Sequence, residues 1–187
     1  MGNAASRAVF LDRDGTLIEE KEYLSKVEDV VVLPGVTTAL RRLMDAGFRL
    51  FVVTNQSGVG RGYFTMADVE NVHRHLTHEF ALDGVRLDAI YVAPEHPEKP
   101  SRGRKPSPQF LFDARDKFEL DLSQSYLIGD KVIDLECGWN AGVRKSILVR
   151  TGYGGMVEKA APELVSNTPV FDDLPGAAEW IIRNSKP

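Results

Sequence analysis

The chain has 187 residues, a formal net charge of −4, 43% hydrophobic residues and 27% charged residues. This length and composition indicate one globular domain over residues 1–187, and the acidic balance disfavours a nucleic-acid partner, because proteins that follow a phosphate backbone are usually basic. No apolar run approaches the roughly 18 residues that span a bilayer, and no signal peptide is visible, so we expect a cytoplasmic protein with no membrane partner.

The first six residues, MGNAAS, fit the pattern for myristoylation of Gly2. We expect residues 1–6 to be disordered rather than lipidated, because no strong polybasic cluster supplies the second anchor that stable membrane attachment needs.

Short apolar strands alternate with amphipathic helices along the rest of the chain. The expected strands cover residues 8–11, 50–53, 89–92, 126–128 and 146–149, with a last one near Val170. The expected helices cover residues 34–46, 65–80, 108–118, 133–141 and 174–182. Pro34 and Gly47 mark the start and end of the first helix, and Thr65 can cap the second, with Asp68 three residues on. The alternation predicts a three-layer, Rossmann-like α/β fold with a mostly parallel sheet and helices on both faces.

Two carboxylates in FLDRDGTL follow the first expected strand, at the end where α/β sheets bind ligands. A carboxylate at Asp12 can attack phosphorus and form an aspartyl-phosphate. Asp14 points to the same side in extended geometry, where it can protonate the leaving oxygen and then activate water. Taken alone, D-x-D-G also fits an Asx-turn or a fragment of a calcium loop.

The segment FVVTNQSGVGRGYF brings Thr54, Asn55 and Gln56 to the end of the second expected strand. Its glycines allow backbone amides to approach an anion, and Arg61 adds a cation. The glycine spacing matches neither a dinucleotide fingerprint nor a P-loop, so by itself the segment could equally be a flexible loop.

The segment SRGRKPSP gathers Arg102, Arg104 and Lys105 just before the expected helix over residues 108–118. Such a group is often a solvated basic loop. It is also the kind of cation that a phosphatase needs to neutralise phosphoryl oxygens.

In LIGDKVIDLECG, Asp130 ends a strand and would meet Asp12 at the edge of the sheet. Carboxylates this close repel one another unless a cation lies between them, and magnesium prefers oxygen ligands. The alternative is a helix N-cap at Asp130 with a first-turn acid at Asp134. Cys137, the single cysteine, excludes an intramolecular disulfide or a zinc site of several thiolates, and we expect it to pack as a small hydrophobe rather than act as a nucleophile.

Three histidines fall on the expected helix over residues 65–80. His73 and His75 point to opposite sides and cannot form a joint metal site. His75 and His78 could share one face, but we expect them to be exposed to solvent.

Taken together, D-x-D-G-T, T-N-Q, R-K-P and G-D-K-x-x-D resemble the haloacid dehalogenase-like (HAD) phosphatases. The longer strings FLDRDGTL, VVTNQSGVGRGYF, IYVAPEHP, GRKPSP and IGDKVID are similar to the subgroup of heptose-bisphosphate phosphatases and bacterial histidinol-phosphatases. The resemblance covers residues 9–152.

The resemblance implies roles for individual residues. Asp12 is expected to be the nucleophile and, with Asp130 and the main-chain oxygen of Asp14, to hold Mg²⁺; Asp134 could stand behind these ligands. Asp14 is the acid and base, and Thr54 and Lys105 stabilise the phosphoryl group. The expected substrate contacts are Arg13, Glu20, Lys21, Glu22, Tyr23, Asn55, Gln56, Ser57, Arg61, Arg104 and Lys131.

The loops show one departure from the family pattern and permit one further inference from spacing. Family members often hold a structural zinc with a C-x-H pair and a C-x-C pair, but the corresponding positions here are Ala93, Glu95, Ser101 and Gly103, so we predict no zinc. The stretch between Leu17 and Pro34 is too short for an inserted lid domain. We therefore expect an open cleft with no cap domain.

The expected function is magnesium-dependent hydrolysis of a phosphomonoester on a small metabolite by a monomer. The favoured substrate is D-glycero-D-manno-heptose 1,7-bisphosphate, cleaved at the 7-phosphate; histidinol phosphate or another sugar phosphate is the alternative. A phosphotransferase would need to exclude water, which an open cleft disfavours. A non-catalytic phosphate-binding protein would have no use for Asp14.

Overall fold

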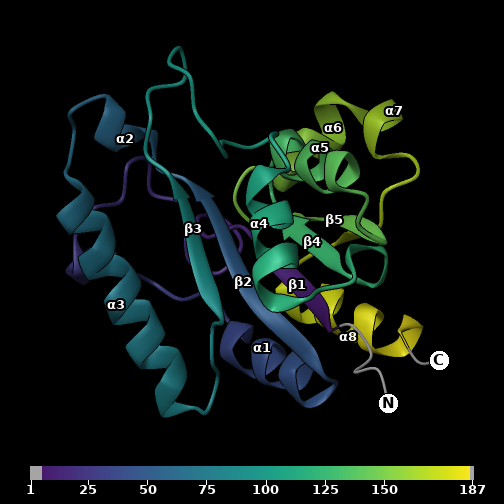
Figure 1. The fold of residues 1–187 in the computed structure, drawn as a ribbon. Coiled ribbons are helices and arrows are strands. Elements are labelled where there is room, and N and C mark those ends of the chain that lie inside the picture. Colours follow the sequence, from purple (N-terminus) through teal and green to yellow (C-terminus); the bar gives the residue numbers. More distant parts are fainter. Residues whose placement is uncertain (1–5, 186–187) are drawn as a thin grey trace.

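Six strands form one parallel sheet in the computed structural model, which describes residues 6–185 (Figure 1). They are β1 (Arg7–Leu11), β2 (Phe48–Asn55), β3 (Ala89–Ala93), β4 (Tyr126–Gly129), β5 (Lys145–Val149) and β6 (Val170–Phe171). Their order is β3-β2-β1-β4-β5-β6, and every neighbouring pair is parallel. The carboxyl end of β1 is thus the switch point at which α/β sheets bind ligands. The predicted α/β class is confirmed.

Helices cover both faces of this sheet. One face carries α1 (Val36–Asp45), α3 (Met66–Leu82) and α8 (Leu174–Asn184), and the other carries α4 (Gln109–Phe118) and α5 (Val132–Ala141). The shorter elements are α2 (Ser57–Gly60), α6 (Gly154–Ala160), α7 (Pro162–Val165) and the 3₁₀ turns η1 (Val27–Asp29) and η2 (Leu122–Gln124). Figure 1 shows the loop between β3 and α4 rising beyond the sheet, next to α2.

The central strand β1 is buried on both faces. Val9 and Leu11 pack with α1, α3 and α8, whereas Ala8 and Phe10 pack with α4 and α5. A strand buried in this way reads as a continuous apolar run rather than an alternating one. It also delivers the residue that follows, Asp12, into the interior, where Asp12 is 5% exposed.

Local signals fix the helix boundaries. The predicted N-cap at Thr65 is confirmed, and it forms a capping box: the Thr65 hydroxyl accepts from the Asp68 amide, and the Asp68 carboxylate accepts from the Thr65 amide. Helix α1 begins at Val36, two residues later than expected, since Gly35 just before it has a left-handed φ of 75°. Helices α6 and α7 were not among the predicted elements.

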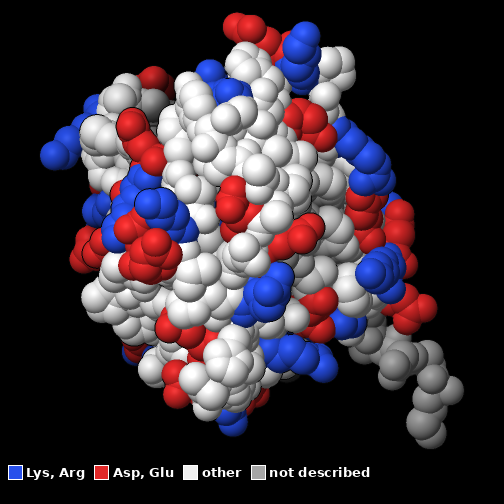
Figure 2. All heavy atoms as spheres, turned by 90° about the vertical axis from the view of Figure 1, so that its left-hand side faces the viewer, with Lys and Arg blue, Asp and Glu red and all other residues white. Residues whose placement is uncertain are grey.

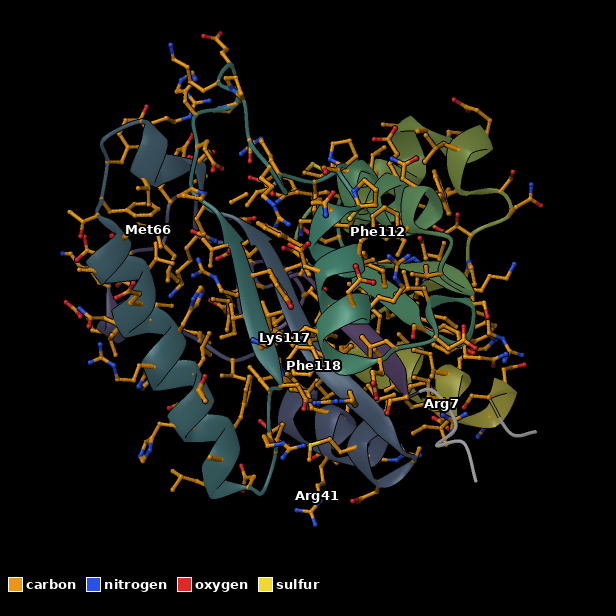
Figure 3. All side chains as sticks on the ribbon, in the orientation of Figure 1. Arg7, Arg41, Met66, Phe112, Lys117 and Phe118 are labelled. Atoms are coloured by element: carbon orange, nitrogen blue, oxygen red, sulfur yellow. The ribbon has the colours of Figure 1, made fainter. Side chains whose placement is uncertain are left out.

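Arg7 links the two ends of the described chain (Figure 3). Its guanidinium donates to the carbonyl oxygens of Ser185 and Ala46, both at 2.7 Å, and lies 4.4 Å from the centre of the Phe48 ring. These contacts fix α8 against the amino end of the sheet, away from the carboxyl ends of the strands.

The predicted disorder and the myristoylation pattern of MGNAAS lie outside the described residues, apart from Ser6. The amide of Ser6 donates to the carbonyl of Glu119 over 3.1 Å, and its carbonyl accepts from the amide of Asp121 over 2.8 Å.

Between residues 6 and 185, no helix is long and apolar enough to cross a membrane. On the face shown in Figure 2, basic and acidic side chains are interspersed. Cys137 is buried in the core on the α4 and α5 face of the sheet, which confirms that it packs as a small hydrophobe. Burial raises the pKa of its thiol to about 12.

Candidate active site

The carboxyl ends of three neighbouring strands converge on one group of polar side chains. Asp12 follows β1, Thr54 lies at the end of β2, and Asp130 follows β4. Lys105 reaches the same point from the loop between β3 and α4, and Asp134 comes from the first turn of α5. The predicted meeting of Asp12 with Asp130 therefore occurs, although the two are distant in sequence.

Lys105 connects two buried carboxylates. Its ammonium nitrogen lies 2.6 Å from Oδ1 of Asp12 and 2.6 Å from Oδ1 of Asp134, and it donates to the carbonyl of Val53 over 2.7 Å. A buried ammonium needs such partners, since an unpaired charge in the interior is costly. Burial lowers the pKa of Lys105, but Asp12 and Asp134 outweigh it, and the pKa stays above its ordinary value.

Asp12 and Asp130 have pKa values shifted in opposite directions. Burial raises the pKa of Asp12, but Lys105 and Lys131 outweigh it and hold that pKa below its ordinary value. Burial, followed by repulsion from Asp12, raises the pKa of Asp130 to about 8, and the nearby charge of Lys131 does not offset these two effects. Asp12 is thus ionised at neutral pH, as a nucleophile must be, whereas Asp130 would need a further cation to ionise fully.

The surroundings of Asp130 fit a divalent cation. One carboxylate oxygen each from Asp12, Asp130 and Asp134 lies within 4.8 Å of the other two. Oδ1 of Asp130 is buried and has no hydrogen-bond partner among the described residues, while Oδ2 accepts from the amide of Tyr153 over 2.8 Å. Clustered oxygen donors with one free are the set that Mg²⁺ prefers.

Asp134 is engaged elsewhere. Its Oδ1 pairs with Lys105, and its Oδ2 accepts from the amide of Lys131 over 2.9 Å, which closes the first turn of α5. Asp12 and Asp130 are therefore the better-placed metal ligands, and Asp134 supports Lys105. The N-cap of α5 is Lys131 rather than Asp130.

Two glycines let the backbone approach Asp130 closely. Gly15 has φ +83° and Gly152 has φ +57°. A Cβ atom on Gly15 would lie 2.4 Å from Oδ2 of Asp130, and one on Gly152 would lie 2.3 Å from it. Gly15, the glycine of D-x-D-G, therefore both permits the turn after Asp14 and leaves room for the Asp130 carboxylate.

Asp14 is held from two sides. Arg13 donates to both of its oxygens, from Nε over 3.0 Å and from Nη2 over 2.9 Å. Gln56 donates to Oδ2 of Asp14 over 2.9 Å and to the hydroxyl of Thr54 over 2.8 Å. The Thr54 hydroxyl accepts there and keeps its own proton to donate, and Oδ1 of Asp14 keeps a free lone pair.

Asn55 fixes the backbone of Lys105. Its amide nitrogen donates to the Lys105 carbonyl over 3.2 Å, and its amide oxygen accepts from the Lys105 N–H over 3.0 Å. This two-way bond joins the end of β2 to the loop that carries Lys105. The predicted substrate contact thus also has a structural role.

Two adjoining cavities, of about 270 Å³ and about 210 Å³, open onto this group and share Asp14, Asn55, Ser57 and Lys131 among their lining residues. The larger cavity is bounded by Glu20, Glu22 and Tyr23 of the flap, which is the segment between Leu17 and Pro34. The smaller cavity is bounded by Asp12, Arg104 and Lys105. The flap carries β-bridges and one 3₁₀ turn rather than a lid domain.

The flap is attached at two points. Glu20 lies 2.7 Å from the ammonium group of Lys131. The rings of Tyr23 and Tyr63 meet edge to face at 4.7 Å, and Tyr23 has an unusual φ of 61°. Both tyrosines are exposed, and Tyr23 lines the larger cavity.

At the four positions in and beside the loop between β3 and α4 where the family resemblance implies zinc ligands, only Glu95 has a side chain of a usual zinc-ligand type. Glu95 has the only carboxylate of the four, since Ala93 and Gly103 have no donor side chain. The Ser101 hydroxyl instead donates to Glu95 over 2.6 Å and accepts from the Arg104 amide over 3.2 Å. These residues do not fit a zinc site, and the hydrogen bonds hold the loop in its place.

Of the other predicted substrate residues, Lys21 and Arg61 line neither cavity, whereas Arg13 lines the larger one. Lys21 is exposed and donates to the carbonyl of Asp29 over 2.7 Å. Arg61 is exposed near Arg104. Arg13 is only 1% exposed and contacts Asp14.

One residue at the site was not predicted. His73, on α3, lies with Nε2 3.1 Å from Nη1 of Arg13. It shares the inward face of α3 with Val69, Val72 and Leu76, and that spacing is the signal that would have found it. Of the two histidines expected at the surface, His78 is exposed and His75 is half-buried.

The comparisons with known proteins agree with this geometry. Residues 103–177 match the family described as HAD-hydrolase-like. The chain is 35% identical over 184 residues to D-glycero-beta-D-manno-heptose-1,7-bisphosphate 7-phosphatase of Escherichia coli K12, covering 95% of this chain and 88% of that protein. It is 38% identical over 193 residues to D-glycero-D-manno-heptose-1,7-bisphosphate 7-phosphatase of Thermosynechococcus vestitus, covering 96% and 97%.

A solved structure gives the same result. The D,D-heptose 1,7-bisphosphate phosphatase of B. bronchiseptica, complexed with magnesium and phosphate, superposes with a TM-score of 0.87 at 31% identity, over 95% of this chain and 98% of that one. The fold and site define a phosphatase of the HAD-like class. The chain belongs to the HAD-like family of heptose-bisphosphate phosphatases.

Proposed function

We propose that this chain removes the 7-phosphate of D-glycero-D-manno-heptose 1,7-bisphosphate in a magnesium-dependent reaction through an aspartyl-phosphate on Asp12. The observation that carries the chemistry is Asp12 itself, ionised, buried and held 2.6 Å from Lys105 beside the partnerless oxygen of Asp130. The named relatives support the substrate, because the similarity extends over nearly the whole chain.

In the first step, a carboxylate oxygen of Asp12 attacks phosphorus and the bond between phosphorus and the sugar oxygen breaks. Asp14 gives its proton to that leaving oxygen. Lys105 and the hydroxyl of Thr54 balance charge on the phosphoryl oxygens. Asp12 and Asp130, with the main-chain oxygen of Asp14, would hold Mg²⁺, which would add positive charge beside those oxygens.

In the second step, a water molecule attacks the phosphorus of the aspartyl-phosphate. Asp14, ionised after the first step, takes a proton from that water. The bond between phosphorus and Asp12 breaks, which releases inorganic phosphate and restores both carboxyl groups.

The cavities suit a small polar substrate with two anionic ends. Lys131 and Arg104 lie in the walls with Asn55 and Ser57, so a second phosphate has cations available. We propose these residues, with Gln56 and the flap residues Glu20, Glu22 and Tyr23, as the substrate contacts. Lys21, Arg61 and Arg13 are weaker candidates. The first two are exposed and line neither cavity, and Arg13 already donates to Asp14.

We further propose that residues 1–187 act as a single-domain monomer in the cytoplasm, without zinc and without a nucleic-acid or membrane partner. A zinc requirement can be checked by measuring bound metal after purification and activity after zinc-selective chelation. One equivalent of tightly bound zinc would contradict this part of the proposal.

Phosphate release by the purified protein tests the function. The substrates are both anomers of heptose 1,7-bisphosphate, histidinol phosphate and several sugar monophosphates, with the product identified by ³¹P NMR. We expect the highest kcat/KM with a heptose bisphosphate and heptose 1-phosphate as product, abolished by EDTA and restored by Mg²⁺. Preference for histidinol phosphate would assign the alternative substrate, and phosphoryl transfer to a sugar acceptor would assign a transferase.

A further inference from the structure

A buried histidine lies behind the proposed acid and base. His73 comes from the middle of α3 and is 9% exposed, and its Nε2 lies 3.1 Å from Nη1 of Arg13. Burying a polar side chain in the interior is costly unless it has a hydrogen-bond partner. His73 is not among the described residues that line either cavity at the site.

The hydrogen bond fixes the state of the ring. Burial, followed by the charge of Arg13, lowers the pKa of His73 to about 3, so the imidazole is neutral at the pH of the cell. A guanidinium group can only donate. Nε2 of His73 therefore accepts from Arg13, and the ring proton is on Nδ1.

Each of the three side-chain nitrogens of Arg13 donates to a protein group. Nε and Nη2 donate to the two oxygens of Asp14, and Nη1 donates to His73. Arg13 lines the larger cavity, but it is only 1% exposed, and three of its five N–H groups already donate to protein acceptors. Because the guanidinium is planar and rigid, the position of Nη1 determines where the edge facing Asp14 lies.

We propose that His73 is a positioning residue for the reaction: it seats the guanidinium of Arg13, which fixes the Asp14 carboxylate towards the leaving oxygen. The proposal rests on the function of Asp14 given above. Gln56 holds the same carboxylate from the other side, so loss of His73 loosens Asp14 without releasing it. The expected effect is a partial loss of proton transfer.

Proton transfer to the leaving group can be measured separately from folding. A poor leaving group depends on the acid, whereas a good one departs almost without it. The measurement is kcat/KM, which reports the steps up to cleavage of the ester, for 4-nitrophenyl phosphate and for phenyl phosphate. For His73→Leu we expect a loss of about tenfold or more with phenyl phosphate and only about twofold with 4-nitrophenyl phosphate.

Three further variants separate positioning from structure. His73→Gln places an amide oxygen near the position of Nε2 and should recover most of the activity with phenyl phosphate. His73→Asn is polar but too short to reach Arg13, and it should behave like His73→Leu. His78→Leu, an exposed substitution on the same helix, should leave both rates unchanged. If the leucine variant does not fold, the Gln and Asn pair carries the test.

A double variant adds an independent criterion. With Asp14→Asn there is no acid left to position, so adding His73→Leu should cause no further selective loss with phenyl phosphate. Equal losses with both aryl phosphates, or equal activity of His73→Gln and His73→Asn, would overturn the proposal while leaving the phosphatase function intact. A wild-type protein that hydrolyses no phosphomonoester would instead refute the function itself.

Discussion

The ammonium group of Lys105 lies 2.6 Å from the carboxylate of Asp12, and both side chains are almost completely buried. Such a pair is not a strong source of stability in itself, because desolvation opposes the Coulomb attraction. Its value lies in the chemistry. Asp12 stays ionised beside a cation that is already in place for the phosphoryl oxygens.

Replacing Lys105 by methionine should lower kcat by about 10²–10³-fold, the usual effect of removing one preorganised charge-stabilising group. The change also leaves Asp12 and Asp134 without their shared cation, so we expect unfolding in urea to become easier by about 3 kcal/mol in metal-free protein. Lys117→Met is the matched control, since Lys117 is exposed at the end of α4 (Figure 3). Wild-type turnover in Lys105→Met would contradict the role.

Gly152→Ala should raise the Mg²⁺ concentration needed for half-maximal activity by tenfold or more. The new Cβ would lie 2.3 Å from Oδ2 of Asp130 and would displace that carboxylate from the metal site. Gly142→Ala controls for backbone strain, because Gly142 has a similar φ of +72° but no neighbouring atom within 4 Å of the position that a Cβ would take. Gly142→Ala should lose about 1–2 kcal/mol of stability. Gly152→Ala should lose more, because its Cβ would also lie 2.7 Å from the Cα of Gly15. An equal Mg²⁺ requirement in the two variants would contradict the assignment of Asp130.

The pH dependence of stability should report on His73. Its pKa is about 3 in the folded protein and near 6.5 in the unfolded chain, so the unfolded state binds the extra proton between these values. The stability that neutral His73 provides is present above pH 6.5 and is lost as the pH falls towards 3. Between pH 5 and 6, the unfolding free energy of the wild type should fall more steeply than that of His73→Gln, by about 1 kcal/mol per pH unit. If the two curves of unfolding free energy against pH were parallel, the His73 ring would be solvated and this prediction would be wrong.

Ser101→Ala should affect specificity more than chemistry. The Ser101 hydroxyl joins Glu95 to the Arg104 amide, and Arg104 lines the cavity next to Asp12. We expect KM for heptose 1,7-bisphosphate to rise about fivefold, while kcat/KM for 4-nitrophenyl phosphate stays the same, since each lost hydrogen bond is worth about 1 kcal/mol. A proportional loss on both substrates would assign Ser101 to general stability, and Ser107→Ala in the same loop is a matched control.

Much of the fold follows from local signals. The apolar run before Asp12 predicts a central parallel strand, and Thr65 with Asp68 predicts the start of α3. The short helices α6 and α7 escaped prediction because GGMVEKAAPELV has no clear periodic apolar face, and their core contacts come from packing against β5.

The site was predictable where topology alone decides it. Asp12, Thr54 and Asp130 end adjacent parallel strands, so the fold must bring them together. The partners of Arg13 and Asp134 could not be foreseen in the same way. The position of Arg13 next to the proposed nucleophile suggests a substrate contact. Only the packing of α3 against the sheet reveals that Arg13 instead donates to His73.

The most direct test is to locate the phosphoryl group on the protein during turnover. Wild-type protein mixed with Mg²⁺ and heptose 1,7-bisphosphate is quenched in acid within one turnover, treated with borohydride and digested for mass spectrometry. Reduction of an acyl phosphate should convert residue 12 into homoserine, and Asp12→Asn should give neither homoserine nor free phosphate. Turnover in the wild type with no modification at Asp12, or full turnover in Asp12→Asn, would contradict the mechanism.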